Sequence, residues 1–236
     1  GSLVHRANLL NGLGNKVISR FKVLSGMNIA EKRASQVGAC SFDYSYNYYR
    51  LRVSTIPTPA SETLHIRLLD QGCLKLYGSD LGMEAGLDKR IIERVQSAPG
   101  LLLFTGPNGA GKTTTVSSLV NEISHLLSIV SVENPIEYFL ANVSQQQTNV
   151  KAGHDVQQLM SSSMLKMPGL LFLGEIRDNH TAQAALNCAR KGTPVISTMS
   201  AAGIVSALEL LLRLGIASSE ISEYISAIVS QRLVRK

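Results

Sequence analysis

One segment of the sequence constrains the fold more strongly than any other. Residues 101–105 form an apolar run of the length expected for a buried strand. The run leads into a loop of the pattern G-x-x-x-x-G-K-T, from Gly106 to Thr113, and a helical pattern follows over residues 113–124. This strand–loop–helix order is typical of loops that cradle phosphate groups, so the sequence predicts a nucleotide site at the end of a strand.

The composition of this loop (the P-loop) indicates which groups would hold a triphosphate. Many hydrogen-bond donors must lie close together, and backbone N–H groups at a helix N-terminus supply them where residues are small. Lys112 is expected to reach the β- and γ-phosphates, and the Thr113 hydroxyl to be a ligand of Mg²⁺. The predicted nucleotide-binding residues are Gly106, Pro107, Asn108, Gly109, Ala110, Gly111, Lys112, Thr113 and Thr114.

Composition limits the class of protein. At 236 residues and 44% hydrophobic content, the chain is long enough to bury a core and to form two small domains. No run approaches the ~18 apolar residues of a membrane span, and the first residues do not resemble a signal peptide. The cysteines at positions 40, 73 and 188 form no C-x-x-C pair, so reduced thiols and a cytoplasmic location are expected. The formal charge of +6 is spread along the chain, so nucleic-acid binding is not expected.

The chain changes character near residue 80. Before this point the patterns predict a helix over residues 15–26, strands over 41–54 and 62–69, and a proline-containing turn between the strands. We therefore expect a small α+β domain over residues 1–79. The glycine-rich stretch 78–86 is the expected linker.

After residue 80, apolar runs alternate with helical patterns. A helix is expected over residues 88–96, and strands over 101–105, 129–132, 170–173 and 195–198. Such alternation favours a parallel sheet built of β-α-β units. Residues 80–236 are therefore expected to form an α/β domain.

Two acidic residues follow predicted strands. Glu175 ends the run that begins at residue 170, and Glu133 follows the run that begins at residue 129. Ligands of parallel sheets bind at the carboxyl ends of the strands, so both acids should lie near the P-loop. There Glu175 would polarise water or hold the magnesium shell, and Glu133 would act as a general base.

Several short motifs occur in an order that is characteristic of one family. After the P-loop come V-E-N-P-I-E-Y at 132–138, L-G-E-I-R-D at 173–178 and Q-R-L-V-R at 231–235; before it stand V-I-S-R at 17–20, A-E-K-R at 30–33 and R-V-S-T-I-P-T at 52–58. Together these resemble the secretion ATPases of type II secretion and type IV pilus assembly, over nearly the whole chain. The segments at 52–58 and 231–236 look closer to the assembly and secretion branch than to the retraction branch.

The resemblance implies a RecA-like ATPase domain preceded by a small PAS-like domain. It also implies a cytoplasmic homo-hexamer that uses ATP and Mg²⁺ and acts on the cytoplasmic part of an inner-membrane platform protein, driving pilus assembly or type II secretion. By motif, Glu175 corresponds to the Walker B acid and Glu133 to the first acid of the aspartate box. Arg52 and Arg67 correspond to arginines of the small domain that reach the γ-phosphate, for which a guanidinium fork is well suited.

The sequence departs from the family at four positions. Asn134 and Gly169 stand where an aspartate is usual, and Thr193 and Ser200 stand where a histidine is usual. Ser200 can still donate a hydrogen bond but carries no charge. We therefore expect slow or partner-dependent hydrolysis. The chain is also shorter than the family at both ends, as expected of an excised core.

Two alternative functions remain open at this point. One is an ATP-binding structural hexamer with little hydrolysis, which the four departures would permit. The other is a RecA-like motor that moves DNA, although the chain has no Trp and only 5% aromatic residues to stack on bases. The backbone near residues 81–83 is the expected contact for adenine.

Overall fold

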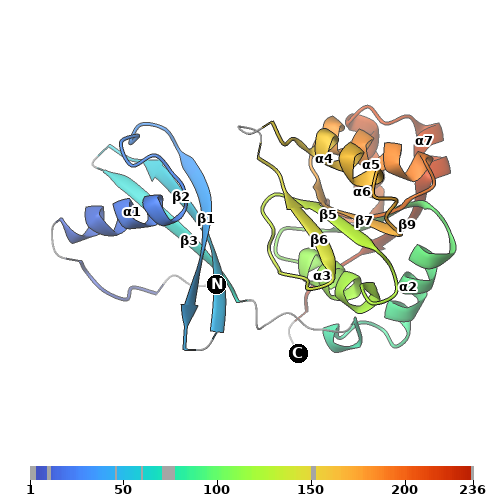
Figure 1. The fold of residues 1–236 in the computed structure, drawn as a ribbon, viewed down its shortest axis with the longest axis horizontal. Coiled ribbons are helices and arrows are strands. Elements are labelled where there is room, and N and C mark those ends of the chain that lie inside the picture. Colours follow the sequence, from blue (N-terminus) through green and yellow to red (C-terminus); the bar gives the residue numbers. More distant parts are fainter. Residues whose placement is uncertain are drawn as a thin grey trace. The chain divides into compact units, whose positions relative to one another are not determined.

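The computed structural model describes residues 4–9, 12–45, 47–59, 61–70, 78–149 and 153–234. It divides into two compact units, Gly1–Cys73 and Leu74–Lys236, both drawn in Figure 1. The expected boundary at residue 79 lies inside the second unit, where a short 3-10 helix η2 spans Gly78–Leu81. A PAS-like fold for the first unit stays a prediction.

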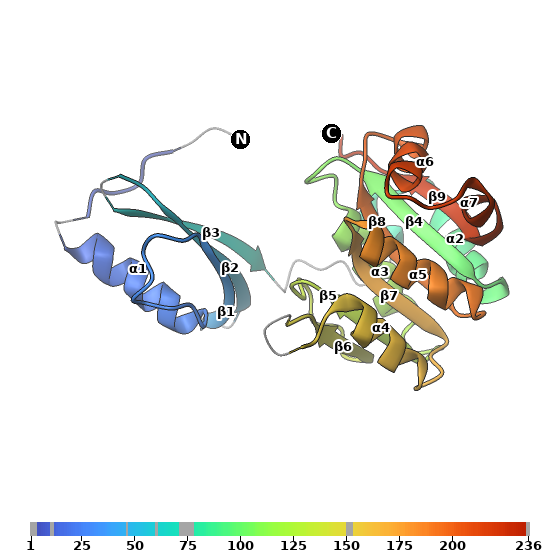
Figure 2. The ribbon, with the colours of Figure 1, turned by 90° about the horizontal axis from the view of Figure 1, so that it is seen from above.

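The first unit pairs one helix with a three-stranded antiparallel sheet. The elements are α1 (Leu13–Leu24), β1 (Gln36–Tyr44), β2 (Asn47–Pro57) and β3 (Glu62–Asp70), with strand order β1-β2-β3. Helix α1 lies against one face of this sheet (Figures 1 and 2). On that face Leu51 and Val53 of β2 are buried.

The expected single strand over residues 41–54 is wrong. The chain reverses between β1 and β2, with Tyr44 paired to Asn47 and with Ser45 at a φ of 49°. This turn contains neither Gly nor Pro, the strongest turn residues, so the sequence marks it only weakly, through Ser45 and Asn47. Strand β2 also runs on into the expected turn, which is reduced to a loop closed by a 2.8 Å hydrogen bond from Thr58 N to Ser61 O.

A buried charge ties the helix of this unit to its sheet. Lys22 is 1% exposed, and its ammonium donates to Glu31 O at 2.7 Å and forms an ion pair with Glu62 of β3. A buried lysine requires such partners, because an unpaired charge in the interior is costly.

The second unit is built on a six-stranded sheet in which every pairing is parallel. Its strand order is β6-β5-β7-β8-β4-β9. After η2 the elements are α2 (Leu87–Ser97), β4 (Gly100–Gly106), α3 (Lys112–Ile123), β5 (Ile129–Glu133), β6 (Val143–Gln147), α4 (Val156–Met164), β7 (Leu170–Ile176), α5 (Asn179–Arg190), β8 (Pro194–Ser200), α6 (Ile204–Arg213), α7 (Ser218–Tyr224) and β9 (Ile225–Ser230). The predicted parallel α/β arrangement is confirmed, and β6 and β9 are strands that the sequence patterns did not reveal.

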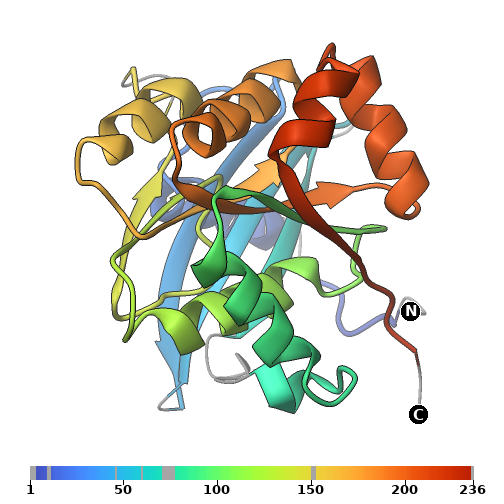
Figure 3. The same ribbon diagram turned by 90° about the vertical axis from the view of Figure 1, so that its right-hand side faces the viewer.

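Helices cover both faces of this sheet (Figure 3). Helices α2 and α3 bury Ile91, Val116 and Leu119 against one face, and α4, α5 and α6 bury Met160, Leu186 and Leu211 against the other. Every residue of β4 is buried, because its side chains meet a helical layer on either side. Among the described residues no helix has both the length and the apolar character needed to cross a membrane.

The expected linker at residues 78–86 begins as packed structure. The backbone N–H of Gly78 donates to Glu122 Oε2 at 3.0 Å, and a Cβ on Gly78 would lie 2.7 Å from Asp88 Cβ. Glycine is needed here for close approach to α2 and α3 rather than for flexibility. The first residues of the expected linker thus lie within the second unit.

Candidate nucleotide site

The P-loop joins the carboxyl end of β4 to the first residue of α3. Gly109 and Gly111 take φ values of 79° and 81°, in the left-handed region that favours glycine. A Cβ on Gly106 would lie 2.5 Å from Gln231 O. The loop can therefore bring its backbone N–H groups and the N-terminus of α3 close to an anion.

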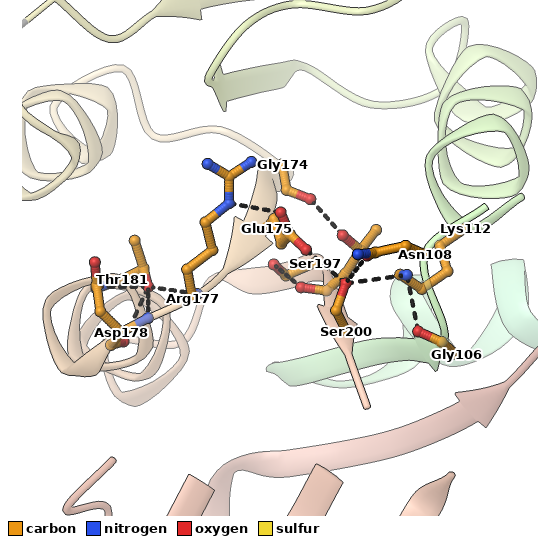
Figure 4. A network of polar contacts seen from close by, with 11 residues as sticks. Gly106, Asn108, Lys112, Gly174, Glu175, Arg177, Asp178, Thr181, Ser197 and Ser200 are labelled. Atoms are coloured by element: carbon orange, nitrogen blue, oxygen red, sulfur yellow. Dashed lines mark hydrogen bonds and ion pairs between the residues drawn. The ribbon is translucent and has the colours of Figure 1, made fainter. Parts of the chain in front are cut away.

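Lys112 lies at the centre of this loop and is only 7% exposed. Its ammonium donates to Gly106 O at 2.9 Å and to Ser200 Oγ at 3.3 Å (Figure 4). It also donates to Pro107 O at 3.0 Å. Burial lowers the pKa of Lys112, although the nearby charge of Glu175 opposes this shift.

Glu175 lies at the end of β7, where the register with β8 shifts between Leu173 and Glu175. One carboxylate oxygen accepts a hydrogen bond from Arg177 Nε at 2.6 Å, and the other accepts from Ser200 Oγ at 2.8 Å (Figure 4). Burial alone would raise the pKa of Glu175, but these hydrogen bonds and the neighbouring positive charges bring it below its usual value. The carboxylate is therefore ionised at neutral pH.

Glu133, at the end of β5, is 4% exposed and is held by neighbours on the sheet. Ser131 Oγ and Gln145 Nε2 both donate to its Oε1, at 2.6 and 3.0 Å. Burial raises the pKa of Glu133 above its usual value. Gln145 belongs to β6, so a sequence reading that missed this strand could not find the contact.

A cavity of about 500 Å³ opens beside these groups. Thr113, Glu133, Asn134 and Glu175 line it together with residues of the first turns of α4 and α5. The cavity thus gathers the P-loop helix and the carboxyl ends of β5 and β7 around one space, as the strand order requires.

The oxygen ligands around this cavity fit Mg²⁺. A hydroxyl (Thr113) and two carboxylates (Glu133 and Glu175) are the hard donors that this ion prefers. The described part of the chain holds no group of three or more His, Cys, Asp or Glu residues arranged for a metal.

The four departures from the family separate into two groups. Gly169 and Thr193 immediately precede β7 and β8, at the amino ends of these strands, whereas Asn134 and Ser200 lie at the carboxyl ends of β5 and β8. A Cβ on Gly169 would lie 3.3 Å from Leu127 Cβ. An aspartate at residue 169 would therefore crowd the amino edge of the sheet without reaching the P-loop.

Arg52 and Arg67 belong to the first unit. They lie directly opposite each other on β2 and β3, so both project from the same face of the sheet. Their contact with a γ-phosphate stays a prediction, as does the contact between adenine and residues 81–83. Met83 packs at the edge of the core beneath α2 and α3.

The segment after β9 supports the P-loop, a contact that sequence reasoning missed. Gln231 N donates to Thr105 O, and Gln231 Nε2 donates to Ala110 O, both at 2.8 Å. Gln231 opens the Q-R-L-V-R motif, but only the fold brings it to the P-loop, where Ala110 lies 121 residues earlier in the chain.

Comparison with known proteins agrees with this geometry. The family model for "Type II/IV secretion system protein" matches residues 2–236. The chain is 36% identical over 224 residues to type II secretion system protein E of Aeromonas hydrophila, covering 94% of this chain and 45% of that protein. It is 33% identical over 237 residues to the type IV pilus assembly ATPase PilB of Thermus thermophilus, covering 100% of this chain and 27% of that protein.

The fold is likewise similar to a solved structure, that of the pilus retraction motor PilT with bound ADP. The TM-score is 0.68 at 23% identity, over 86% of this chain and 60% of that one. This likeness supports the RecA-like parallel sheet. The chain spans less than half the length of the two curated relatives. Together, the family match and the arrangement around the P-loop identify the chain as a member of the type II/IV secretion system protein family.

Proposed function

We propose that this chain binds ATP with Mg²⁺ and hydrolyses it as part of a motor for type IV pilus assembly or type II secretion. One observation carries the proposal. Lys112 of the P-loop, Ser200 of β8 and Glu175 of β7 form a single hydrogen-bonded cluster beside the cavity (Figure 4).

Phosphate binding would use groups that the loop already holds in position. The ammonium of Lys112 now donates to two loop carbonyls, those of Gly106 and Pro107. A phosphate oxygen is a stronger acceptor than a neutral carbonyl because it is charged. We therefore expect Lys112 to exchange these carbonyls for phosphate oxygens, while the N-terminus of α3 contributes backbone donors.

Hydrolysis would divide the work between the two acids. Glu133, with its raised pKa, is the stronger base of the two and would accept a proton from the attacking water. Glu175, ionised and held by Arg177, would orient that water. Thr113 would hold Mg²⁺, which when bound would supply charge stabilisation for the transferred phosphoryl group.

The arginine pair of the small unit supports a link between hydrolysis and motion. Like charges directly opposite each other on neighbouring strands repel, so an anion between Arg52 and Arg67 would stabilise this sheet. We infer that these arginines reach the γ-phosphate, so that catalysis depends on the position of the unit. The proposed assembly is a homo-hexamer that acts on the cytoplasmic part of an inner-membrane platform protein.

Phosphate release by wild type and by Lys112→Ala tests the hydrolysis. We expect turnover in Lys112→Ala to fall to background, because the substitution removes the ammonium that would bind the β- and γ-phosphates. Lys191→Ala is the matched control, since Lys191 is an exposed lysine at the C-terminus of α5. Equal turnover in wild type and Lys112→Ala would contradict the proposal.

Binding of a fluorescent ATP analogue to the same proteins distinguishes a hydrolysing motor from the alternative, an ATP-binding structural hexamer. That alternative is favoured by the uncharged Ser200 at the centre of the cluster. It predicts tight binding by wild type with no phosphate release above that of Lys112→Ala, even when the platform protein is present.

A further inference from the structure

The hydroxyl of Ser200 meets three groups of the site at once. It lies 3.3 Å from Lys112 Nζ, 2.9 Å from Asn108 Oδ1 and 2.8 Å from Glu175 Oε1 (Figure 4). The strand order explains why: β8 lies between β7 and β4. Ser200 is the last residue of β8 and pairs in register with Gly106, the first residue of the P-loop.

The Ser200 hydroxyl cannot donate a hydrogen bond to both of its acceptors at once. Lys112 can only donate to the hydroxyl. The hydroxyl has a single proton, so it can donate to Asn108 Oδ1 or to Glu175 Oε1 but not to both at the same time. Its orientation therefore selects between an acceptor on the P-loop and an acceptor on β7.

The choice matters most for Glu175. Its other oxygen is held by Arg177 at 2.6 Å, so the Ser200 hydroxyl decides whether the carboxylate is held at one end or at both. A side chain held by two hydrogen bonds is oriented more firmly than one held by a single bond, and orientation of catalytic groups governs rate.

We propose that Ser200 is a positioning residue for ATP hydrolysis, whose hydroxyl makes the orientation of the Glu175 carboxylate depend on the state of the P-loop. When an N–H group of Asn108 donates to a phosphate oxygen and its Oδ1 moves away from Ser200, the hydroxyl turns to Glu175, which is then held from both sides. This inference rests on the proposed hydrolysis at the same site. It also explains how the neutral Ser200 can act at a position where a histidine is usual, because a hydroxyl orients the carboxylate without neutralising it.

Two variants that differ by one group test the role of the hydroxyl. Ser200→Thr keeps the hydroxyl, whereas Ser200→Val replaces it by a methyl group of similar size, and both residues suit a strand end. Ser161→Ala is a control at an exposed serine of α4. Each protein is assayed for phosphate release over a range of ATP concentrations and for binding of a fluorescent ATP analogue.

A positioning role predicts a change in kcat rather than in affinity. We expect kcat of Ser200→Val to fall by about 10- to 100-fold, the range for losing a group that orients a catalytic residue. The Kd for the analogue should change by less than about threefold, because Lys112 and the N-terminus of α3 remain to bind the phosphates. Ser200→Thr should retain most of the turnover. Normal turnover in Ser200→Val, or an equal loss in both variants, would overturn the proposal.

If wild type hydrolyses ATP too slowly to measure, the proposed hydrolysis itself has failed. A second measurement, which needs no turnover, then tests the positioning role of Ser200. ADP with Mg²⁺ and aluminium fluoride imitates the transferring phosphoryl group, and a correctly oriented site should retain fluorescent ADP after removal of free nucleotide. We expect retention by wild type and Ser200→Thr and release by Ser200→Val. Equal retention in all three proteins, or in none, would refute the positioning role.

Discussion

The two edges of the six-stranded sheet consist of the same strands and hold opposite kinds of structure. At the carboxyl edge, charged and hydroxyl side chains meet across four strands around a cavity. At the amino edge, glycines allow close packing: a Cβ on Gly100 would lie 2.9 Å from Ser226 Cβ, and one on Gly169 would lie 3.3 Å from Leu127. One edge is arranged for chemistry and the other for packing.

This difference changes how the departures from the family should be judged. Gly169 and Thr193 lie at the packing edge, so their identity should affect stability more than turnover. Asn134 and Ser200 lie at the chemical edge, where Asn134 lines the cavity and Ser200 contacts the P-loop lysine. The expectation of slow hydrolysis therefore depends on these two residues.

The largest effect should come from Glu175→Gln. The substitution keeps the shape but removes the carboxylate that would orient the attacking water, and we expect kcat to fall by about 100-fold or more, as when a reacting group is misplaced. Phosphate release measures the effect, with Glu209→Gln on α6 as an exposed control. If Glu175→Gln turns over like wild type, the carboxyl edge does not hold the chemistry we assign to it.

Glu133→Gln should have a smaller effect on turnover and a distinct dependence on pH. A base works only when ionised, and the pKa of Glu133 is raised by burial, so wild-type turnover should fall as the pH drops through that raised pKa. Removal of the base should cost about 100-fold in kcat, at the low end of the range for general-base catalysis, and abolish this acid limb. An acid limb that persists in Glu133→Gln would assign the titration to another group.

The same residue makes a prediction for stability. A carboxyl with a raised pKa in the folded state binds its proton more tightly there, so stability falls as the pH rises from the unfolded pKa through the folded one. Glu133→Gln should therefore melt at a higher temperature than wild type at pH 7.5, and the gain should vanish at low pH. A gain that is independent of pH would mean that burial of this charge is not its cause.

The smallest effect on turnover should come from Gly169→Ala. The added Cβ would crowd Leu127, so we expect a loss of about 1 kcal/mol of stability with kcat changed by less than about twofold. Thermal unfolding and phosphate release together check this. A large loss of kcat in a folded Gly169→Ala protein would remove the distinction between the two edges.

Much of the second unit could be predicted from the sequence because its central strands are apolar on both faces. Strands β4, β5, β7 and β8 stand out in this way, and the P-loop and the acids at strand ends follow from them. Strand β6 lies at the end of the sheet and is rich in glutamine, so it carries no apolar run. Strand β9 follows α7 directly, with no loop residue to mark its start.

The contacts of the site were harder to predict than its residues. Lys112, Glu133 and Glu175 are marked by their places after strands, but Gln145, Ser200 and Gln231 act through partners that only the sheet order brings near. In the sequence, Ser200 stands out because it replaces a histidine, and its contacts with Lys112 and Glu175 do not follow from any local pattern. Contacts between distant segments depend on the order of the strands in the sheet, which no single local pattern encodes.

The support that Gln231 gives to the P-loop has a mechanical consequence. Strand β9 lies at one end of the sheet, beside β4, and passes directly into Gln231. Two hydrogen bonds connect this residue to Thr105 and Ala110. Tension along β9 would therefore reach the phosphate loop without passing through any helix, and a tightened loop would in turn resist displacement of the strand.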